Sequence, residues 1–178
     1  SNFTGFNVFA GIPGVSLRYV TRACDLGTPD MVILPGTKNT IHDLLWMRQN
    51  GLEAAILKLA DRQVPVWGIC GGYQMMGEVL VDKKGVESDL PSRTSGMGLL
   101  PLKTEFEEEK IRTQVEGAFG QLDGCLGGLS GKSIEGYEIH MGRTYIDREE
   151  GAADTARIVS WRREPEICRP MDLSLIHI

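Results

Sequence analysis

Cys70 is the residue whose surroundings point most directly to chemistry. It lies in VPVWGICGGYQMMG, residues 64–77, and glycines stand at positions 68, 71 and 72. The apolar run before it and the helix-forming run after it predict a strand, a sharp turn and a helix, which is how many hydrolases hold their nucleophile. Such a turn needs neighbours with little or no side chain, and the glycines meet that need. A cysteine placed there is a candidate nucleophile for attack on a carboxamide carbon.

The same turn suggests how the attack would be assisted. It puts the sulfur of Cys70 at the start of a helix, where the helix dipole and free backbone N–H groups favour the thiolate over the thiol. Attack creates an oxyanion, which needs hydrogen-bond donors fixed in advance. The backbone N–H of Gly71 is one candidate donor, and that of Gly36, which follows the apolar run 31–34, is another. Both glycines are expected at the carboxyl edge of a parallel sheet, where ligand sites lie in open α/β folds.

The other three cysteines and the glycines also have less specific interpretations. Free cysteines are usually inert core residues, which is our interpretation of Cys24, Cys125 and Cys168. A glycine-rich strand–helix turn can instead bind phosphate, but the sequence contains no G-x-x-x-x-G-K-[ST] pattern. The cysteines are widely spaced and form no C-x-x-C pair, which argues against a zinc site and a dense disulfide framework. We therefore expect reduced thiols and no metal ligands.

The elements that must position Cys70 alternate between strands and helices. Apolar and β-branched runs predict strands at residues 15–20, 31–34 and 64–69. Helical spacing of apolar residues predicts a helix over 40–61, capped by Asn39 or Thr40 and broken or bent at Gly51, and a second helix is expected over 72–80. Strands separated by helices of this length favour a parallel sheet with right-handed crossovers.

The back half of the chain has few helical stretches. Strand-like residues occur at 98–106, 111–115, 133–146 and 156–161. We interpret this half as an antiparallel extension of the sheet. The acidic cluster of four glutamates within residues 105–109 is expected to be a solvated strand end or loop.

Composition limits the class of protein. The chain has 178 residues, 42% of them hydrophobic, which suits one globular domain with a core. The net charge is -5 and no basic stripe is present, which argues against nucleic acid as a partner. No apolar run reaches the ~18 residues needed to cross a bilayer, and the N-terminus shows no signal peptide. We expect a cytoplasmic protein that uses neither nucleic acid nor a membrane.

Three stretches together resemble the glutamine amidotransferase domain of cobyric acid synthase, a class I, triad-type amidotransferase of cobalamin biosynthesis. They are PDMVILPGTKNTIHDLL at 29–45, GICGGYQMMG at 68–77 and GYEIHMGRT at 136–144. The resemblance covers roughly residues 1–161. It implies a flavodoxin-like α/β fold, with a mostly parallel central sheet flanked by helices and extended by antiparallel strands.

The resemblance also implies a reaction. A glutamine-dependent amide ligase of this family hydrolyses glutamine and supplies the ammonia for ATP-dependent amidation of carboxylates on adenosylcobyrinic acid a,c-diamide. By residue, it implies Cys70 as the nucleophile, Gly36 and Gly71 as oxyanion positions, and Gln74 as a residue that holds the substrate amide. No cofactor is expected in this domain. ATP and Mg would belong to an N-terminal synthetase domain, which would be its partner and would hold the corrinoid substrate.

The general base stays open. His140 is one candidate, because imidazole titrates near neutral pH and can move the proton. The resemblance instead implies a catalytic histidine in a later motif of the type GTYLHG, which this sequence lacks; His140 would then line or support the site. His42 is expected at the surface or in a helix cap, and His177 lies in the terminal segment.

The departures from the family pattern lead to two further expectations. We expect an amidotransferase domain over 1–161 that lacks its first strand and its catalytic-histidine motif, followed by a divergent tail over 162–178 that is artefactual at its end. We also expect such a fragment to be weakly active or inactive alone. Two alternative functions remain, an amidotransferase subunit acting on a peptidoglycan precursor and a non-catalytic glutamine-binding module.

Overall fold

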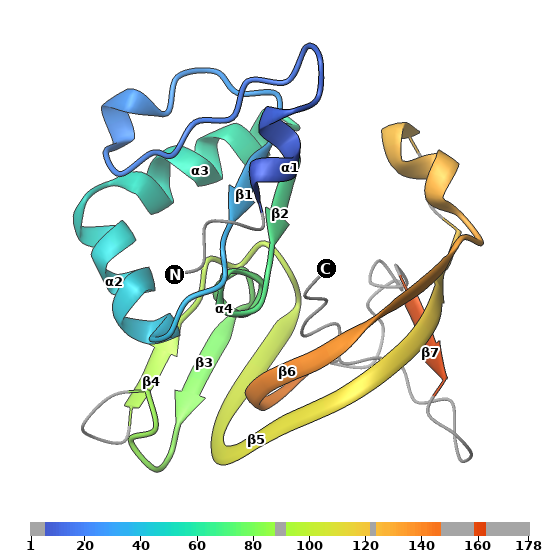
Figure 1. The fold of residues 1–178 in the computed structure, drawn as a ribbon. Helices are drawn as coiled ribbons and strands as arrows, with labels where there is room; N and C mark the ends of the chain where they lie inside the picture. Colours follow the sequence, from blue (N-terminus) through green and yellow to red (C-terminus); the bar gives the residue numbers. More distant parts are fainter. Residues whose placement is uncertain (1–5, 88–91, 122–123, 147–158, 163–178) are drawn as a thin grey trace.

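The structure is a computed structural model and describes residues 6–87, 92–121, 124–146 and 159–162 (Figure 1). Its helical elements are α1 (Asn7–Ala10), η2 (Ala23–Asp25), α2 (Thr40–Gln49), α3 (Leu52–Asp61), α4 (Gly71–Met75) and η3 (Gly124–Leu129). Its strands are β1 (Val32–Leu34), β2 (Val66–Gly68), β3 (Val79–Asp82), β4 (Ser92–Ser95), β5 (Leu102–Phe119), β6 (Ser133–Ile146) and β7 (Val159–Arg162). None of the helices in these ranges is long and apolar enough to cross a membrane.

Among the described strands, two pairs are parallel. β1 and β2 pair in parallel, with Leu34 opposite Gly68, and β3 pairs in parallel with β5. The remaining pairs, β3–β4, β5–β6 and β5–β7, are antiparallel. The predicted α/β class is therefore confirmed. The back half is mainly antiparallel, as predicted, but it forms a separate sheet with β3 and β4 and does not extend the β1–β2 pair. Figure 1 shows α2 and α3 beside the β1–β2 pair and the long β5–β6 hairpin on the other side of the molecule.

The helix predicted over 40–61 is found as two helices that meet at Gly51. The side chain of Asn39 accepts the backbone N–H of His42 at 2.9 Å, so Asn39 is the N-cap of α2, as predicted. Gly51 has a φ of +72°, which ends α2 and turns the chain into α3 without steric cost. Arg48 spans the break and donates to both carboxylate oxygens of Glu53, at 2.6 and 2.8 Å.

Two of the predicted elements are wrong. Residues 15–20 form no strand. Within the described ranges they have no strand beside them to pair with, and their side chains stay largely exposed, Tyr19 at 55%. The helix expected over 72–80 ends after one turn, at Met75. Gly77 lies close to the backbone carbonyl of Leu102, and residues 79–82 then pair with β4 and β5. Cross-strand pairing outweighs the helical preference of this stretch, because the β-branched valines pack well in a sheet.

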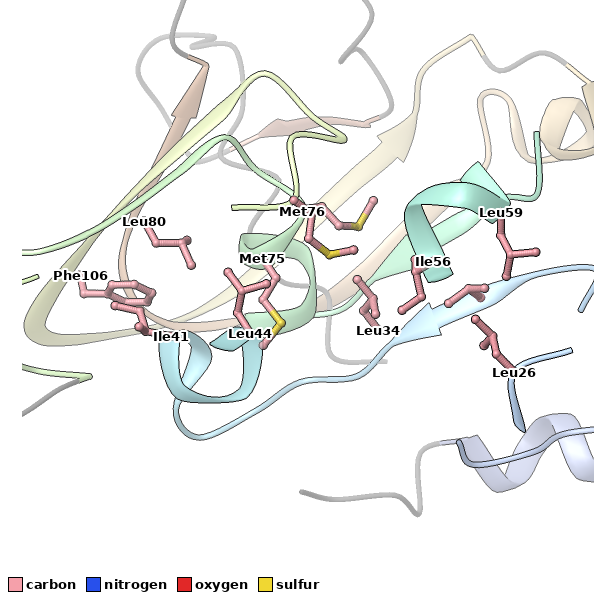
Figure 2. Packing of buried hydrophobic residues seen from close by; sticks show 12 residues of the cluster. Leu26, Leu34, Ile41, Leu44, Ile56, Leu59, Met75, Met76, Leu80 and Phe106 are labelled. Atoms are coloured by element: carbon pink, nitrogen blue, oxygen red, sulfur yellow. The ribbon is translucent and has the colours of Figure 1, made fainter. Parts of the chain in front are cut away.

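The hydrophobic core packs against α4 and holds it in place. Figure 2 shows Met75 of α4 and the next residue, Met76, packed among side chains of β1, α2, α3 and β3. The other labelled members of this cluster are Leu26, Leu34, Ile41, Leu44, Ile56, Leu59, Leu80 and Phe106. Leu44 and Leu80 are fully buried. Because such interiors are packed as densely as crystals of small molecules, α4 has little freedom to move relative to β1 and α2.

The acidic cluster is neither a loop nor a strand end. It lies inside β5, at an irregularity in the pairing with β6 between Glu105 and Lys110. Glu105 accepts hydrogen bonds from Tyr145 at 2.7 Å and from Lys83 at 2.9 Å. Exposed cations lie near its neighbours, Arg143 near Glu107 and Lys84 near Glu108. Cations from β6 and from the segment after β3 therefore offset the local repulsion.

Replacing Tyr145 with phenylalanine is expected to raise the pKa of Glu105. The Tyr145 hydroxyl is the largest cause, before Lys83 and Lys103, that lowers this pKa from 4.5 to about 2. The folded-state pKa is depressed, so the stabilising effect of Glu105 is present above about pH 4.5 and is lost as the pH falls towards 2. A carboxyl titration followed by NMR measures the shift. Lys84→Ala, which removes a contact to Glu108 instead, is the control, and an unchanged pKa in Tyr145→Phe would contradict the prediction.

Candidate active site

Cys70 is held in a backbone conformation that residues with a side chain seldom adopt. It lies between the end of β2 and the start of α4, with φ +54° and ψ −119°. Among the described residues, only one other non-glycine residue, Gln63, has a positive φ. Such a conformation costs about 1–3 kcal/mol, persists only where the surroundings enforce it, and clusters at functional sites. The sharp turn predicted around Cys70 is therefore present, and its backbone is strained.

Hydrogen bonds on both sides enforce this turn. The N–H of Ile69 donates to the carbonyl of Leu34 at 2.9 Å, which ties the end of β2 to β1. After the turn, the N–H of Gly72 donates to the carbonyl of Ile69 at 2.9 Å, and that of Gln74 donates to Cys70 at 3.0 Å. The backbone of Cys70 is thus fixed by the sheet before it and by the first helical turn after it.

The three glycines around Cys70 allow close packing as well as a sharp turn. A Cβ atom at Gly68 would overlap the backbone of Tyr73 in the following helix. One at Gly71 would overlap the side chain of Thr37, and one at Gly72 would overlap the backbone carbonyl of Leu34. The predicted need for small residues is confirmed. Its cause is the loop after β1, which packs directly against the start of α4.

Gly36 lies against Cys70. A Cβ atom built on Gly36 would stand 3.3 Å from the Cβ of Cys70, which brings the loop after β1 into contact with the candidate nucleophile. Within the described part of the chain, neither the N–H of Gly36 nor that of Gly71 donates to a backbone carbonyl. The two glycines proposed from the sequence as oxyanion positions are therefore beside Cys70, on adjacent loops at the carboxyl ends of β1 and β2.

Gln74 is buried, with 3% of its surface exposed. This excludes the simpler interpretation of Gln74 as a polar residue on the outside of the helix. Its side-chain oxygen accepts a hydrogen bond from the hydroxyl of Thr40 at 3.4 Å. The same hydroxyl would stand 2.9 Å from a Cβ atom on Gly71, so the amide of Gln74 lies close to the turn that carries Cys70.

Two threonines that were not predicted as site residues belong to this neighbourhood, although Thr40 was named as a possible helix cap. Thr37 contacts Gly71, accepts the N–H of Asn39 at 3.1 Å and donates to the carboxylate of Asp43. Thr40 contacts Gly71 and Gln74. Their positions just after Gly36 were a usable signal, because a hydroxyl or carboxylate that caps the first helical turn is recognisable by its spacing.

Of the three histidines, the structure describes the positions of His42 and His140. His140 lies on β6 opposite Ile111 of β5, beyond the irregularity in the hairpin, and β6 packs mainly on β5. Figure 1 shows that part of the hairpin extending away from α4. The side chain of His42 is 74% exposed at the start of α2, as expected. His177 lies outside the described residues.

Predictions were also made for the other cysteines and for the tail. Cys24 is exposed and does not belong to the core, which corrects the expectation of a core residue. Cys168 lies outside the described residues. Strand β7 crosses the expected boundary after residue 161 by one residue, and the rest of the expected tail is outside the described ranges. No group of three or more His, Cys, Asp or Glu side chains in those ranges is arranged to hold a metal ion.

Comparison with protein families gives a match over nearly the whole chain. Residues 1–165 match the model of the CobB/CobQ-like glutamine amidotransferase domain. Among solved structures, the chain is similar to one described as a glutamine amidotransferase. The TM-score is 0.51 at 16% identity, over 89% of this chain and 76% of that one. At this identity the likeness concerns the fold, and it supports the predicted amidotransferase architecture.

Curated relatives are much closer in sequence. Cobyric acid synthase of Ruminiclostridium cellulolyticum is 54% identical over 151 residues, which are 85% of this chain and 29% of that protein. The synthases of Lachnoclostridium phytofermentans and Yersinia enterocolitica are 51% and 50% identical, over 81% and 82% of this chain and 28% of each relative. The chain thus spans less than a third of the length of the relatives that it matches.

Proposed function

The chain belongs to the CobB/CobQ-like glutamine amidotransferase family, and we propose from this premise that it releases ammonia from glutamine through Cys70. The observation that carries the proposal is the strained backbone of Cys70 with Gly36 packed against it. A structural cysteine has no need of a positive φ, and a strand–helix turn with a contacting glycine loop suits a nucleophile with two backbone donors beside it.

The proposed chemistry follows from these positions. The Cys70 thiolate attacks the side-chain carboxamide carbon of glutamine and forms a tetrahedral intermediate. The N–H groups of Gly36 and Gly71 hydrogen-bond the oxyanion. The intermediate collapses when the nitrogen takes up a proton and leaves as ammonia, and the glutamyl group remains as a thioester on the sulfur. Water then hydrolyses the thioester to glutamate and frees the thiolate.

Two further roles complete the proposal. Gln74 helps to hold the substrate amide, because its own buried amide lies beside the turn that carries Cys70. The proton for the leaving ammonia has to come from a general acid. His140, within the motif at 136–144, is the candidate that the sequence offers for this role, although its part of β6 extends away from α4.

The ammonia is proposed to serve an ATP-dependent amidation. The names of the relatives favour cobyric acid synthesis, in which carboxylates of adenosylcobyrinic acid a,c-diamide receive the ammonia. Because this chain corresponds to less than a third of those proteins, the synthetase domain that holds ATP, magnesium and the corrinoid is its proposed partner. The alternative of a peptidoglycan precursor as acceptor has no comparable observation in its favour.

A glutamine-directed alkylating agent tests the proposal. The chain, shown to be folded by circular dichroism, is treated with the glutamine analogue diazo-oxo-norleucine, and the adduct is located by peptide mass spectrometry. We expect one adduct, on Cys70, and expect glutamine to suppress it. No adduct on Cys70 in the folded chain, or equal labelling of the exposed Cys24, would refute the proposal.

Replacing Gln74 with alanine is expected to weaken glutamine binding and to leave the reactivity of the Cys70 thiol unchanged. The concentration of glutamine needed to protect Cys70 from diazo-oxo-norleucine should rise by about tenfold, as for loss of one buried hydrogen bond to the substrate. Reaction of Cys70 with iodoacetamide, which needs no glutamine pocket, should be unchanged. Gln49→Ala, at the exposed end of α2, is the matched control. Equal protection in Gln74→Ala and the unmodified chain would remove Gln74 from the binding site.

A further inference from the structure

The loop that carries Gly36 is held at its far end by a residue distant in sequence. The loop runs from the end of β1 to the start of α2, and the backbone N–H of Thr40 is the first of α2. This N–H donates to the side-chain carboxylate of Glu87, and the side-chain amide of Asn39 donates to the backbone carbonyl of Glu87 at 2.6 Å. One residue therefore makes two contacts to the end of the Gly36 loop.

Glu87 is itself fixed by Asp82. Asp82 is the last residue of β3 and is fully buried. One of its carboxylate oxygens accepts the N–H of Val86 and the other accepts the N–H of Glu87, each at 2.8 Å. The short segment after β3 is thereby folded back onto α2. Because β3 follows α4 in the chain, this segment links the helix that begins beside Cys70 to the loop that carries Gly36.

The contacts continue from the segment after β3 to the turn that carries Cys70. Thr40, which Glu87 holds by its N–H, contacts Gly71 and Gln74 through its hydroxyl. A carboxylate is a suitable partner for this position, because the first N–H groups of a helix lack partners within the helix and lie at the positive end of its dipole. Glu87 is thereby connected to Gly71 through Thr40, and to Gly36 through the loop that ends at Asn39 and Thr40.

Holding Glu87 in this place has an electrostatic cost. Burial raises the pKa of Glu87 above its ordinary value, and the backbone N–H groups of Thr40 and Ile41 oppose that effect without cancelling it, while the charge of Asp82 adds to it. A neutral glutamine would keep an acceptor for the Thr40 N–H and avoid the cost of burying a charge. The contact to Thr40 therefore needs an acceptor oxygen at this place, and not a charge.

We propose that Glu87 is a positioning residue that, anchored by Asp82, sets the place of the Gly36 loop relative to Cys70. The proposal rests on the function proposed above for Cys70 and Gly36. Glu87 does not touch the substrate; it acts through Thr40 and Asn39 on the loop. Small displacements of a reacting group lower the rate strongly. Loss of this anchor should therefore slow the reaction of Cys70 with a glutamine analogue, which uses the Gly36 loop.

Variants of Glu87 separate positioning from general structure. Glu87→Ala removes the acceptor and is expected to lower the rate of Cys70 labelling by diazo-oxo-norleucine about tenfold, because the ketone oxygen of this analogue must lie where the glutamine carboxamide oxygen lies. Labelling by iodoacetamide should stay unchanged. Glu87→Gln should restore most of the rate, since its amide oxygen accepts the Thr40 N–H. Glu108→Gln, which alters an exposed carboxylate on β5, is the control.

A second pair of measurements keeps the proposal testable if Glu87→Ala does not fold. Glu87→Asp keeps the charge but shortens the side chain, so it should label more slowly than Glu87→Gln. Equal rates for these two, or an equal loss of both labelling reactions in Glu87→Ala, would overturn the proposal. The amide chemical shifts of Gly36, followed by NMR, report the loop without any reaction. They should move in Glu87→Asp and not in Glu108→Gln, and unchanged shifts would also overturn it.

Different results would refute the function proposed for Cys70 and the positioning role proposed for Glu87. If Cys70 of the unmodified chain takes no glutamine-protected label, the proposed function is wrong, and the Gly36 shifts still decide whether Glu87 positions the loop. If Cys70 is labelled and the Glu87 variants behave like the unmodified chain in both measurements, the function stands and the positioning role is wrong.

Discussion

Replacing Cys70 with alanine is expected to abolish labelling by the glutamine analogue. The reaction needs a nucleophilic sulfur at the turn between β2 and α4, and alanine keeps the Cβ atom while removing the sulfur. Mass spectrometry of the intact chain and of its peptides measures the result. Cys24→Ala, which removes an exposed cysteine away from the turn, should label as fully as the unmodified chain. Residual glutamine-protected labelling of Cys70→Ala would show that another residue is the nucleophile.

Variants at position 70 should also show that the strained backbone lowers the stability of the fold. At a φ of +54° a Cβ atom is unfavourable, and glycine is free of that strain. Cys70→Gly is therefore expected to be more stable than Cys70→Ala by about 1 kcal/mol, after allowing for the greater flexibility of glycine in the unfolded chain. Urea unfolding followed by circular dichroism compares the two. Equal stability, or a less stable glycine variant, would mean that the surroundings do not force Cys70 into a strained conformation.

Replacing Gly72 with alanine is expected to destabilise the fold by about 3 kcal/mol, near the upper end for an oversized residue in a packed site. The added methyl group would overlap the carbonyl of Leu34 and lie 2.7 Å from that of Pro35. Neither backbone group can withdraw without disturbing the pairing of β1 with β2, because Leu34 is opposite Gly68. Labelling of Cys70 should fall with the loss of the folded state.

A glycine in open surroundings gives the matched control for this measurement. Gly128 in η3 has no atom within 4 Å of an added Cβ, so Gly128→Ala should change the free energy of unfolding by less than about 0.5 kcal/mol. Urea midpoints measure both variants. A Gly72→Ala variant as stable as Gly128→Ala would show that the loop after β1 can move away from α4.

The parts of the site that the sequence predicted are local in the chain. Gly68, Gly71 and Gly72 stand within two residues of Cys70, and a turn that tight restricts which residues can occupy it. Gly36 was predicted because it ends an apolar run, and parallel strands bring such ends to one edge of the sheet. The family resemblance of the three motifs then gave the reaction that this arrangement serves.

The parts that the sequence did not predict depend on contacts between distant residues. Glu87 reaches Thr40 across 47 positions, and no local pattern encodes a carboxylate that caps a helix so far away. The failed strand at 15–20 has the right residue types but no neighbouring strand. The acidic run in β5 suggested a loop because its partners, Arg143 and Lys83, are separated from it in sequence.

The pairing of β1 with β2 also determines when the thiol can become reactive. Gly36 and Cys70 each follow one of these strands, so the two halves of the site stand about one strand spacing, ~4.8 Å, apart only after Leu34 has met Gly68. That meeting closes a loop of more than thirty residues, and the pairing has to offset the entropy of that closure. Before it forms, Cys70 and Gly36 have no fixed relation, so selective reactivity of Cys70 would report that these two strands have paired.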